Sequence, residues 1–404
     1  MQHAAATHAL PEPQFAALVD ALAADPARRD ELNGLLREDH SLYDQRGAAT
    51  VVRMRGWVLL ALARAGVSDA ALIFVLEELE SGLDPYLVAA AARALRSYPS
   101  PSETFAPFVM RALTNIRYRD EPISFESYGE YAVAATGTSP VRELLATLAW
   151  LGPHAAGVLD EVRLLRKQGS GLPAKFRVDI DRAIQAIRGP ERSDPPAAPA
   201  CCGAPATVVE RTSSLPPNER CSCAPIASTL LQDHDGATIT FKEFFTGQPT
   251  IVAFFYTRCD NPLKCSLTVT KLARVQASLQ AQGLAERIHT AAITYDPGFD
   301  LPERLRIYGK DRGVRLGAHH RMLRAVEDDD ALREYFKLGV NFIESLVNRH
   351  RIEVYILDTQ GRVAVSFERI HWDEQEVVAR AVEVLNEGVP TEQTGQMFPA
   401  LSDS

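Results

Sequence analysis

Residues 249–266 read Pro249-Thr-Ile-Val-Ala-Phe-Phe-Tyr-Thr-Arg-Cys-Asp-Asn-Pro-Leu-Lys-Cys-Ser266. The run over 251–256 is apolar throughout, which is typical of a strand that is buried on both faces in the middle of a sheet. Two cysteines, Cys259 and Cys265, follow this strand and directly precede a predicted helix. A helix N-terminus stabilises a thiolate through its dipole and its free N–H groups. We therefore expect these two cysteines to act as nucleophiles or as metal ligands.

The segments that follow alternate between strands and helices. Their patterns predict, in this order, a strand, a helix, a hairpin and an amphipathic helix over 288–295, 302–312, 352–367 and 373–385. A dithiol between a strand and a helix, followed by these elements, is the order of the thioredoxin fold. We therefore predict an α/β thioredoxin-like domain over 228–390 and a flexible tail over 391–404.

Three motifs stand out in this half. They are Phe254-Phe-Tyr-Thr-Arg-Cys259 followed by Cys265, then Tyr295-Asp-Pro-Gly-Phe-Asp-Leu-Pro302, and finally His350-Arg-Ile-Glu-Val-Tyr355. In this order they resemble the motifs of the Sco/SenC family, the thioredoxin-fold copper chaperones of cytochrome oxidase. That family has two cysteine ligands, an Asp-Pro-x-x-Asp-x-Pro turn and a copper-binding histidine before a strand at these places. It usually has three residues between its cysteines, whereas this chain has five.

The resemblance implies a copper site made of Cys259, Cys265 and His350. Two thiolates and one imidazole are soft ligands suited to Cu(I), and such a set can accept a further ligand as Cu(II). Asp296 follows the end of a predicted strand, where it could act in the outer shell of the metal or contact a partner. The chain is thus expected to be a metallochaperone that delivers copper or maintains the thiols of a copper-site client.

A second hypothesis uses the same residues without a metal. Cys259 and Cys265 would then be the catalytic pair of a thiol–disulfide oxidoreductase or of a peroxiredoxin-like enzyme. A histidine requirement separates the two hypotheses, because metal binding needs His350 and dithiol exchange mostly does not. The alternative for His350 is a histidine at the end of a strand that has no ligand role, and the copper hypothesis would then fail.

Residues 12–189 are predicted to be all-α. Apolar residues recur at three- and four-residue spacing, and the period-2 alternation of strands is almost absent. The segment 68–79 aligns with 102–113 at an offset of 34 residues, with a second helix between them. Recurring helix pairs are typical of an α-solenoid and resemble HEAT-type repeats, with a non-repeating bundle as the alternative. Solenoids usually present binding surfaces, so we expect this domain to recognise a partner.

The composition changes between the two halves. Residues 190–227 are rich in proline and alanine and lack a periodic apolar pattern, which predicts a flexible linker. All six cysteines of the chain lie in or after this segment, which holds Cys201, Cys202, Cys221 and Cys223. Their thiolates could bind a soft ion such as Cu(I) or Zn(II), or exchange disulfides with the domain that follows. The alternative is a linker whose thiols have no such role.

Charge and hydropathy limit the partners and the compartment. Lys and Arg total 43 against 52 Asp and Glu, and this net charge of −9 disfavours general binding to nucleic acid. No apolar run approaches the ~20 residues of a membrane-spanning helix. No signal peptide is visible, so the residues by themselves predict a cytoplasmic protein. The resemblance implies instead a periplasmic or membrane-associated protein. The partner expected at the helical domain is a client protein, such as a copper enzyme.

Overall fold

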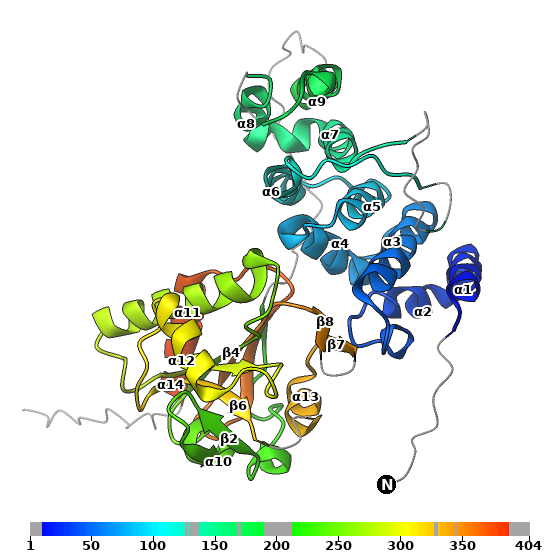
Figure 1. The fold of residues 1–404 in the computed structure, drawn as a ribbon. Helices are drawn as coiled ribbons and strands as arrows, with labels where there is room; N and C mark the ends of the chain where they lie inside the picture. Colours follow the sequence, from blue (N-terminus) through cyan, green and yellow to red (C-terminus); the bar gives the residue numbers. More distant parts are fainter. Residues whose placement is uncertain are drawn as a thin grey trace, which may run out of the picture.

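The computed structural model of the protein describes residues 10–125, 128, 137–167, 171–189, 212–326, 330–343 and 346–387. Within them, buried apolar side chains form two cores. One belongs mainly to the helical half, from Phe15 to Ile187, and the other runs from Ile226 to Leu385. The helical half and the sheet-containing half lie side by side (Figure 1). Among the described residues, no helix combines the length and the apolar character that crossing a membrane requires.

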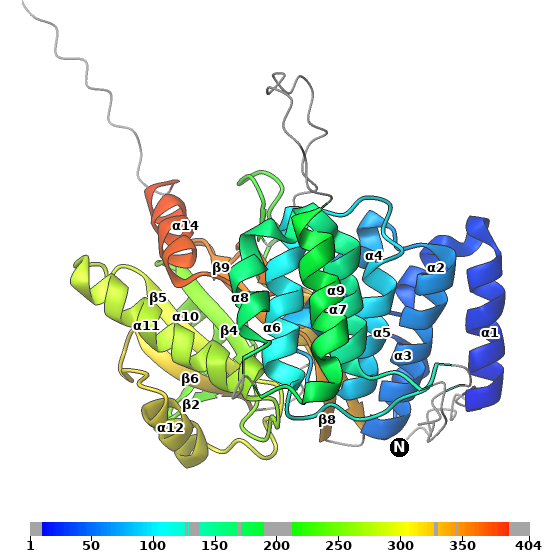
Figure 2. The same cartoon turned by 90° about the horizontal axis from the view of Figure 1, so that it is seen from above.

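The first half consists of helices that stack side by side (Figure 2). Within the described residues they are α1 (Glu12–Ala24), α2 (Arg29–Gly34), α3 (Ala48–Ala65), α4 (Asp69–Ser81), α5 (Pro85–Leu95), α6 (Ala106–Ile116), α7 (Pro140–Leu151), α8 (Leu159–Leu164) and α9 (Arg177–Arg188). Helix α3 packs on α5, α5 on α7 and α7 on α9, while α4 packs on α6. The aligned segments 68–79 and 102–113 thus include neighbouring helices of one layer. This half is helical as predicted, and its HEAT-like class stays a prediction.

The turn between α4 and α5 is fixed by Gly82 and Asp84. A Cβ on Gly82 would lie 2.2 Å from the carbonyl oxygen of Glu78, so no larger residue fits this turn without a shift of the backbone. The carboxylate of Asp84 accepts two backbone N–H groups at the start of α5, both at 3.0 Å, and so caps that helix. Helix α4 therefore ends abruptly at Ser81. Its last carbonyl groups have no partner within the helix and can accept hydrogen bonds from other segments.

The second half is built on an eight-stranded sheet. Its strands are β1 (Thr212–Ser214), β2 (Leu230–Asp233), β3 (Thr238–Thr240), β4 (Thr250–Phe255), β5 (His289–Thr294), β6 (His320–Ala325), β9 (Glu353–Leu357) and β10 (Val363–Glu368). They lie in the order β1-β10-β9-β4-β5-β6-β2-β3. Strand β4 is parallel to β5 and antiparallel to β9, and β5 is parallel to β6. Every residue of β4 is buried, as its apolar run predicts for a central strand.

Helices cover this sheet, and a small hairpin stands apart from it. Helix α11 (Leu267–Ala281) packs against β4 and β5 and beside α14 (Glu374–Glu387), and α12 (Pro302–Asp311) packs against β6. The shorter helices are α10 (Phe241–Phe245) and α13 (Asp330–Phe336). Strands β7 (Val340–Ile343) and β8 (Leu346–His350) form a separate two-stranded sheet beside the helical half (Figure 1). This half has the thioredoxin-like α/β fold that the order of its elements predicts.

The structure differs from the predicted linker at its C-terminal end. Strand β1 pairs with β10 along its whole length. The buried guanidinium group of Arg220 lies 3.2 Å from the carboxylate of Asp358, and Ile226 belongs to the second core. Residues 212–227 therefore form part of the sheet-containing half, because they extend its sheet and bury side chains in it. The rest of the predicted linker and the predicted tail lie outside the described residues.

Candidate metal centre

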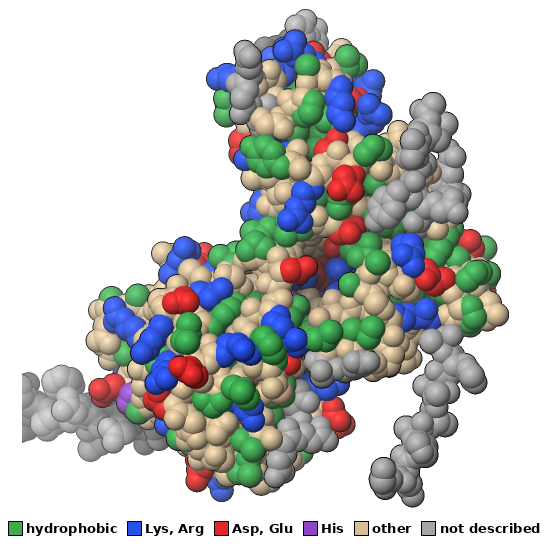
Figure 3. Space-filling model, viewed as in Figure 1, with side chains coloured by type: hydrophobic (Ala, Val, Ile, Leu, Met, Phe, Trp, Pro, Cys, Tyr) green, Lys and Arg blue, Asp and Glu red, His purple; other side chains and the backbone are tan. Residues whose placement is uncertain are grey.

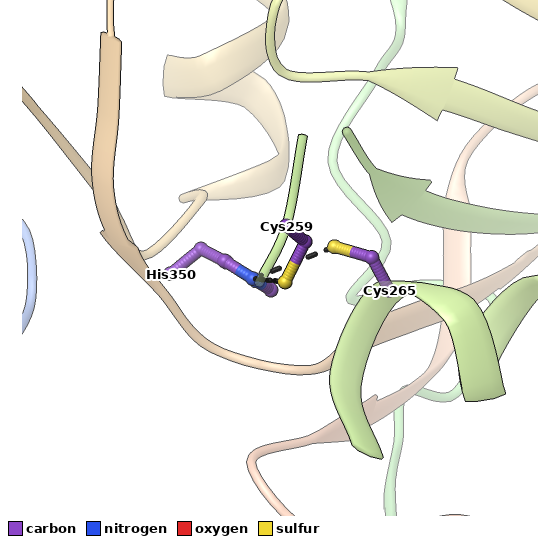
Figure 4. A group of neighbouring side chains, drawn as sticks. All are labelled: Cys259, Cys265 and His350. Atoms are coloured by element: carbon purple, nitrogen blue, oxygen red, sulfur yellow. Dashed lines mark hydrogen bonds between the residues drawn. The ribbon is translucent and has the colours of Figure 1, made fainter. Parts of the chain in front are cut away.

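Three of the predicted site residues meet beside the sheet. Cys259 follows β4, Cys265 lies in a π-helical turn that leads into α11, and His350 is the last residue of β8. The Nε2 atom of His350 is 3.5 Å from the Cys259 Sγ and 3.4 Å from the Cys265 Sγ (Figure 4). The donor atoms all lie within 4.8 Å of one another. In the described part of the chain, no other trio of histidine, cysteine or acidic side chains is close enough to hold a metal ion.

The register of the sheet explains why segments so distant in sequence meet here. Strands β4 and β9 run antiparallel, with Ala253 opposite Val354. The residues that follow β4 therefore lie beside the residues that precede β9. Cys259 comes from the first of these segments and His350 from the second. Cys265 returns to the same place because its helix packs back against β4 and β5.

Two aspartates of the second motif anchor the loop between β4 and Cys259. Asp300 accepts the backbone N–H of Thr257 at 3.1 Å and also accepts its hydroxyl group. Asp296 accepts the guanidinium group of Arg258, whose Nε lies 3.0 Å from the carboxylate. Asp296 is buried and lies outside the Cys–Cys–His group. It supports the residue that precedes Cys259, and its role toward a metal or a partner stays a prediction.

The ring of His350 is held with Nε2 toward the two sulfurs. Its Nδ1 lies 2.9 Å from the backbone carbonyl oxygen of Arg351. A carbonyl oxygen can only accept a hydrogen bond, so Nδ1 carries a proton, and in the neutral imidazole Nε2 then presents its lone pair to the sulfurs. The rings of Tyr256 and Tyr295 pack on the imidazole, with centroid distances of 5.3 and 5.5 Å. The imidazole therefore has the tautomer and the orientation that a metal ligand needs.

The two cysteines differ in their tendency to lose a proton. A hydrogen bond from Cys265, supported by the neighbouring His350, lowers the pKa of Cys259 to about 3, although burial opposes this shift. Burial raises the pKa of Cys265 well above its ordinary value, and the adjacent Cys259 raises it further. At neutral pH we expect a thiolate at Cys259 and a thiol at Cys265 that donates its S–H to it. Such a pair can attack a disulfide, or can offer two thiolates to a metal once Cys265 is deprotonated.

Lys264, in the spacer between the two cysteines, is a site residue that the sequence patterns do not reveal. Its Nζ lies 2.8 Å from the backbone carbonyl oxygen of His350 and 3.1 Å from the carboxylate of Glu77 on α4. It thus connects the spacer both to the histidine and to the helical half. Lysines are mostly exposed, so a lysine in a polar loop gives no functional signal in the sequence. No motif links it to Glu77, which is 187 residues away.

The other predicted thiols do not join this group. Cys221 and Cys223 are free thiols near the turn between β9 and β10, where the Cys223 Sγ lies 3.1 Å from the carbonyl oxygen of Gln360. Burial raises the pKa of Cys223, in contrast to the lowered pKa at the dithiol. Cys201 and Cys202 lie outside the described residues, so their predicted role stays a prediction.

The set of donors fits a soft metal ion. Two sulfurs and one neutral imidazole favour ions such as Cu(I) or Zn(II) over hard ions such as Mg²⁺. Cys265 and His350 are buried, whereas Cys259 is partly exposed and borders a cleft. The site is therefore shielded on one side and accessible on the other. Its fold and its ligands define a thioredoxin-like domain with a dithiol–histidine group suited to metal binding.

Comparison with known proteins assigns this half to a family. Residues 228–386 match the SCO1/SenC family. The C-terminal half of the chain is therefore a SCO1/SenC domain, which confirms the resemblance that its three motifs predict. No curated protein sequence matches the chain.

Several solved structures are similar to a part of the chain. A SCO1/SenC family lipoprotein from Bacillus anthracis is 18% identical, with a TM-score of 0.34 over 38% of this chain and 91% of that chain. Bradyrhizobium japonicum ScoI with copper bound is 19% identical, with a TM-score of 0.32 over 39% of this chain and 96% of that chain. Yeast Sco1 with copper bound is 24% identical, with a TM-score of 0.32 over 41% of this chain and 94% of that chain.

Proposed function

We propose that the protein binds copper at Cys259, Cys265 and His350, and that it delivers the ion to a copper-site client or maintains that client's thiols. The observation that carries the proposal is the meeting of two sulfurs and one imidazole nitrogen within 4.8 Å. The SCO1/SenC match supports it, because all three residues lie within the matched range. The ScoI structure from Bradyrhizobium japonicum and the Sco1 structure from yeast contain copper, the ion proposed here.

Each residue has a separate task when a Cu(I) ion is bound as cargo. Cys259 offers a thiolate without first losing a proton, and His350 offers the lone pair of Nε2. Cys265 gives up its proton, so binding releases one proton from the dithiol. Soft thiolates and an imidazole then satisfy the preference of Cu(I). A client can approach on the exposed side of Cys259 while the two buried ligands keep the ion.

A second function uses the same dithiol without a metal. The thiolate of Cys259 attacks a client disulfide, forms a mixed disulfide and releases one client thiolate, which takes up a proton. Cys265 then loses its proton, attacks Cys259 and releases the second client thiol. The client gains two electrons, and the protein becomes the Cys259–Cys265 disulfide. The lowered pKa of Cys259 beside a protonated Cys265 favours this function.

Copper binding and dithiol exchange can be separated at His350. The full-length protein is used, with its four cysteines outside the site changed to serine and with Cu(I) titrated against bicinchoninate under anaerobic conditions. We expect one bound Cu(I) per chain, because the described residues hold one such trio. His350→Ala should weaken binding by at least ~10–100-fold, the typical cost of even an outer-shell change, and should leave the disulfide able to form. Cys259→Ser and Cys265→Ser should abolish both.

The opposite result would favour the second function. If the protein binds no Cu(I), yet reduces a model disulfide equally well with and without His350, the oxidoreductase function is correct. A protein that binds Cu(I) and also exchanges disulfides would have both activities at one site, with His350 required only for the first.

We further infer that residues 12–189 form a separate domain that recognises the client. The buried core of this half and the packing of its helices in two layers support this inference. Helical arrays of this kind usually act as extended binding surfaces. The client would then contact the helical half while its own ligands approach Cys259.

A further inference from the structure

Helix α4 of the helical half contacts both segments that carry the proposed copper ligands. Its last two turns hold four buried polar residues, Glu77, Glu78, Glu80 and Ser81. Glu77, Glu80 and Ser81 are three and four positions apart, so they share one face of the helix. That face meets the spacer over 260–264, which joins the two cysteines.

Two side chains of the spacer donate hydrogen bonds directly to α4. The Nδ2 of Asn261 donates to the backbone carbonyl oxygen of Ser81 at 2.7 Å. The Nζ of Lys264 donates to the carboxylate of Glu77 at 3.1 Å. The C-terminal end of a helix carries partial negative charge on its free carbonyl groups, which suits both donors.

Two further contacts complete the attachment. The Nε2 of His371 lies 2.6 Å from the carbonyl oxygen of Leu263 in the spacer, and its Nδ1 lies 3.2 Å from the carboxylate of Glu80. On the other ligand segment, Arg349 directly precedes the histidine ligand and forms an ion pair with Glu78. The same helix end therefore holds the cysteine loop and strand β8.

The ion pairs of Lys264 with Glu77 and of Arg349 with Glu78 belong to a larger network of charges between the two halves. Its members are three acidic and four basic residues: Glu38, Glu77, Glu78, Arg55, Lys264, Arg349 and Arg369. Each glutamate contacts two of the basic groups. Ions buried in this way have little water to replace a lost partner, so separation of the halves is costly.

We propose that α4 is a structural part of the metal centre. It clamps the spacer and β8 together, so that Cys259, Cys265 and His350 keep the spacing that holds the ion. Lys264 is the central positioning residue, because it joins Glu77, the spacer and the backbone of His350. The helical half therefore sets the copper affinity of the SCO1/SenC domain. This part of the inference rests on the proposed function, whereas the clamp itself can be tested in the metal-free protein.

The same end of α4 borders the cleft through which a client approaches. The cleft has a volume of about 670 Å³ and is lined by both halves, with Leu83 and Pro85 on one side and Cys259 and His350 on the other. The surface is hollowed where the two halves meet (Figure 3). A client that takes the ion at Cys259 therefore also contacts the turn between α4 and α5.

Lys264→Met tests the clamp, because it keeps an unbranched side chain and removes both hydrogen bonds. We expect the affinity for Cu(I) to fall ~10–100-fold, as for other outer-shell changes. In the metal-free protein, Cys265, which is only 1% exposed, should be alkylated faster by iodoacetamide. Lys271→Met is the matched control, because Lys271 also bonds a carbonyl oxygen, that of Trp372, and its contacts lie within the second half.

Two more variants keep the test independent of misfolding. Asn261→Asp retains the oxygen that accepts the N–H of Leu263 at 3.0 Å, but it cannot donate to Ser81. It should shift both measurements in the same direction as Lys264→Met. Lys264→Arg can still donate to Glu77 and should recover most of the wild-type affinity.

The outcomes distinguish the clamp from the proposed function. If Lys264→Met matches the Lys271→Met control in both Cu(I) affinity and Cys265 alkylation, the clamp is overturned. If the wild-type protein binds no Cu(I), the proposed copper function fails, and the alkylation rate of Cys265 alone decides whether α4 holds the loop.

Discussion

Neutralising Glu38 should measure how firmly the two halves are joined. Its side chain is fully buried, 3.2 Å from Arg55, and its two carboxylate oxygens lie 3.1 and 3.0 Å from Arg369. Glu38→Gln preserves the shape of the side chain and removes its charge. Each arginine then loses one acidic partner but keeps another, Glu78 for Arg55 and Glu77 for Arg369.

The expected loss follows from this partial compensation. Removing one partner from a buried ion pair typically costs about 3–5 kcal/mol. Because both arginines keep a second glutamate, we expect the lower end, a loss of about 3 kcal/mol in the free energy of unfolding. Glu143→Gln is the matched control, since Glu143 is also buried between two arginines, Arg93 and Arg96, but within the helical half. Only Glu38→Gln should make the two halves unfold in separate transitions, because only Glu38 contacts the other half.

The effect of Glu38→Gln should also depend on pH in one direction. Burial alone would raise the pKa of Glu38, but the guanidinium groups of Arg369 and Arg55 outweigh it and hold the pKa below the ordinary value of 4.5. A carboxyl group with a lowered pKa contributes its full stability above pH 4.5 and loses it as the pH falls toward the folded pKa. The difference between wild type and variant should therefore be largest near neutral pH and shrink in acid.

Urea unfolding provides the measurement. Tryptophan fluorescence reports on both halves, since Trp57 and Trp150 lie in the first and Trp372 in the second, and far-UV circular dichroism reports on total structure. A loss below about 1 kcal/mol at neutral pH is what an exposed salt bridge gives, and it would refute the reasoning from burial. A difference that grows as the pH falls would refute the assigned direction of the pKa shift.

Three further outcomes test the dithiol and the boundary between the halves. Alkylation of Cys259 in the metal-free protein should keep nearly the same rate from about pH 5 to about pH 8, because a pKa of about 3 keeps it a thiolate throughout. If the alkylation rate of Cys259 instead fell in proportion to the hydroxide concentration as the pH was lowered through this range, the prediction would be wrong. Mild oxidation should join Cys259 to Cys265, whose sulfurs lie within 4.8 Å, and peptide mapping that finds either one paired with Cys221 or Cys223 would instead indicate a thiol relay. Limited proteolysis should cut first within 190–211 and leave two folded fragments, since the residues on either side pack into two cores. A first cut within the core of either half would count against this division.

Local signals in the sequence predict the centre of the second half well. The apolar run of β4, the cysteine that follows it and the start of α11 lie within a few residues of each other, so no distant contact is needed to recognise them. The β7–β8 hairpin escapes prediction for the opposite reason. Its polar residues pair with the helical half, as Asn348 does with the backbone carbonyl oxygen of Arg46 at 2.7 Å, and this obscures the alternation of a strand.

The site residues also fall into a group that the sequence predicts and a group that it does not. Cys259, Cys265 and His350 can be selected because each lies in a recognisable motif, whereas Glu77 and Lys264 become partners only when α4 reaches the spacer. The spacer between the cysteines has five residues, whereas the SCO1/SenC family usually has three. The structure gives a reason for the longer spacer, because Asn261 and Lys264 within it make the contacts to α4. The error over 212–227 has a simple cause. A strand of three residues beside several prolines has the composition of a linker.

The pairing of β4 with β9 also bears on what should happen when the proposed copper ion leaves the site. Cys259 follows β4, Cys265 leads into α11 and His350 ends β8. The core behind them consists of apolar side chains, and Val252, Ala253, Val354 and Ile356 are all fully buried. In zinc fingers the free energy of metal binding is the free energy of folding, so a chelator denatures them. Here a chelator should empty the site and leave a folded protein. If the protein delivers copper as proposed, it can be loaded and unloaded repeatedly, and the rate is set by ligand replacement on the ion rather than by refolding.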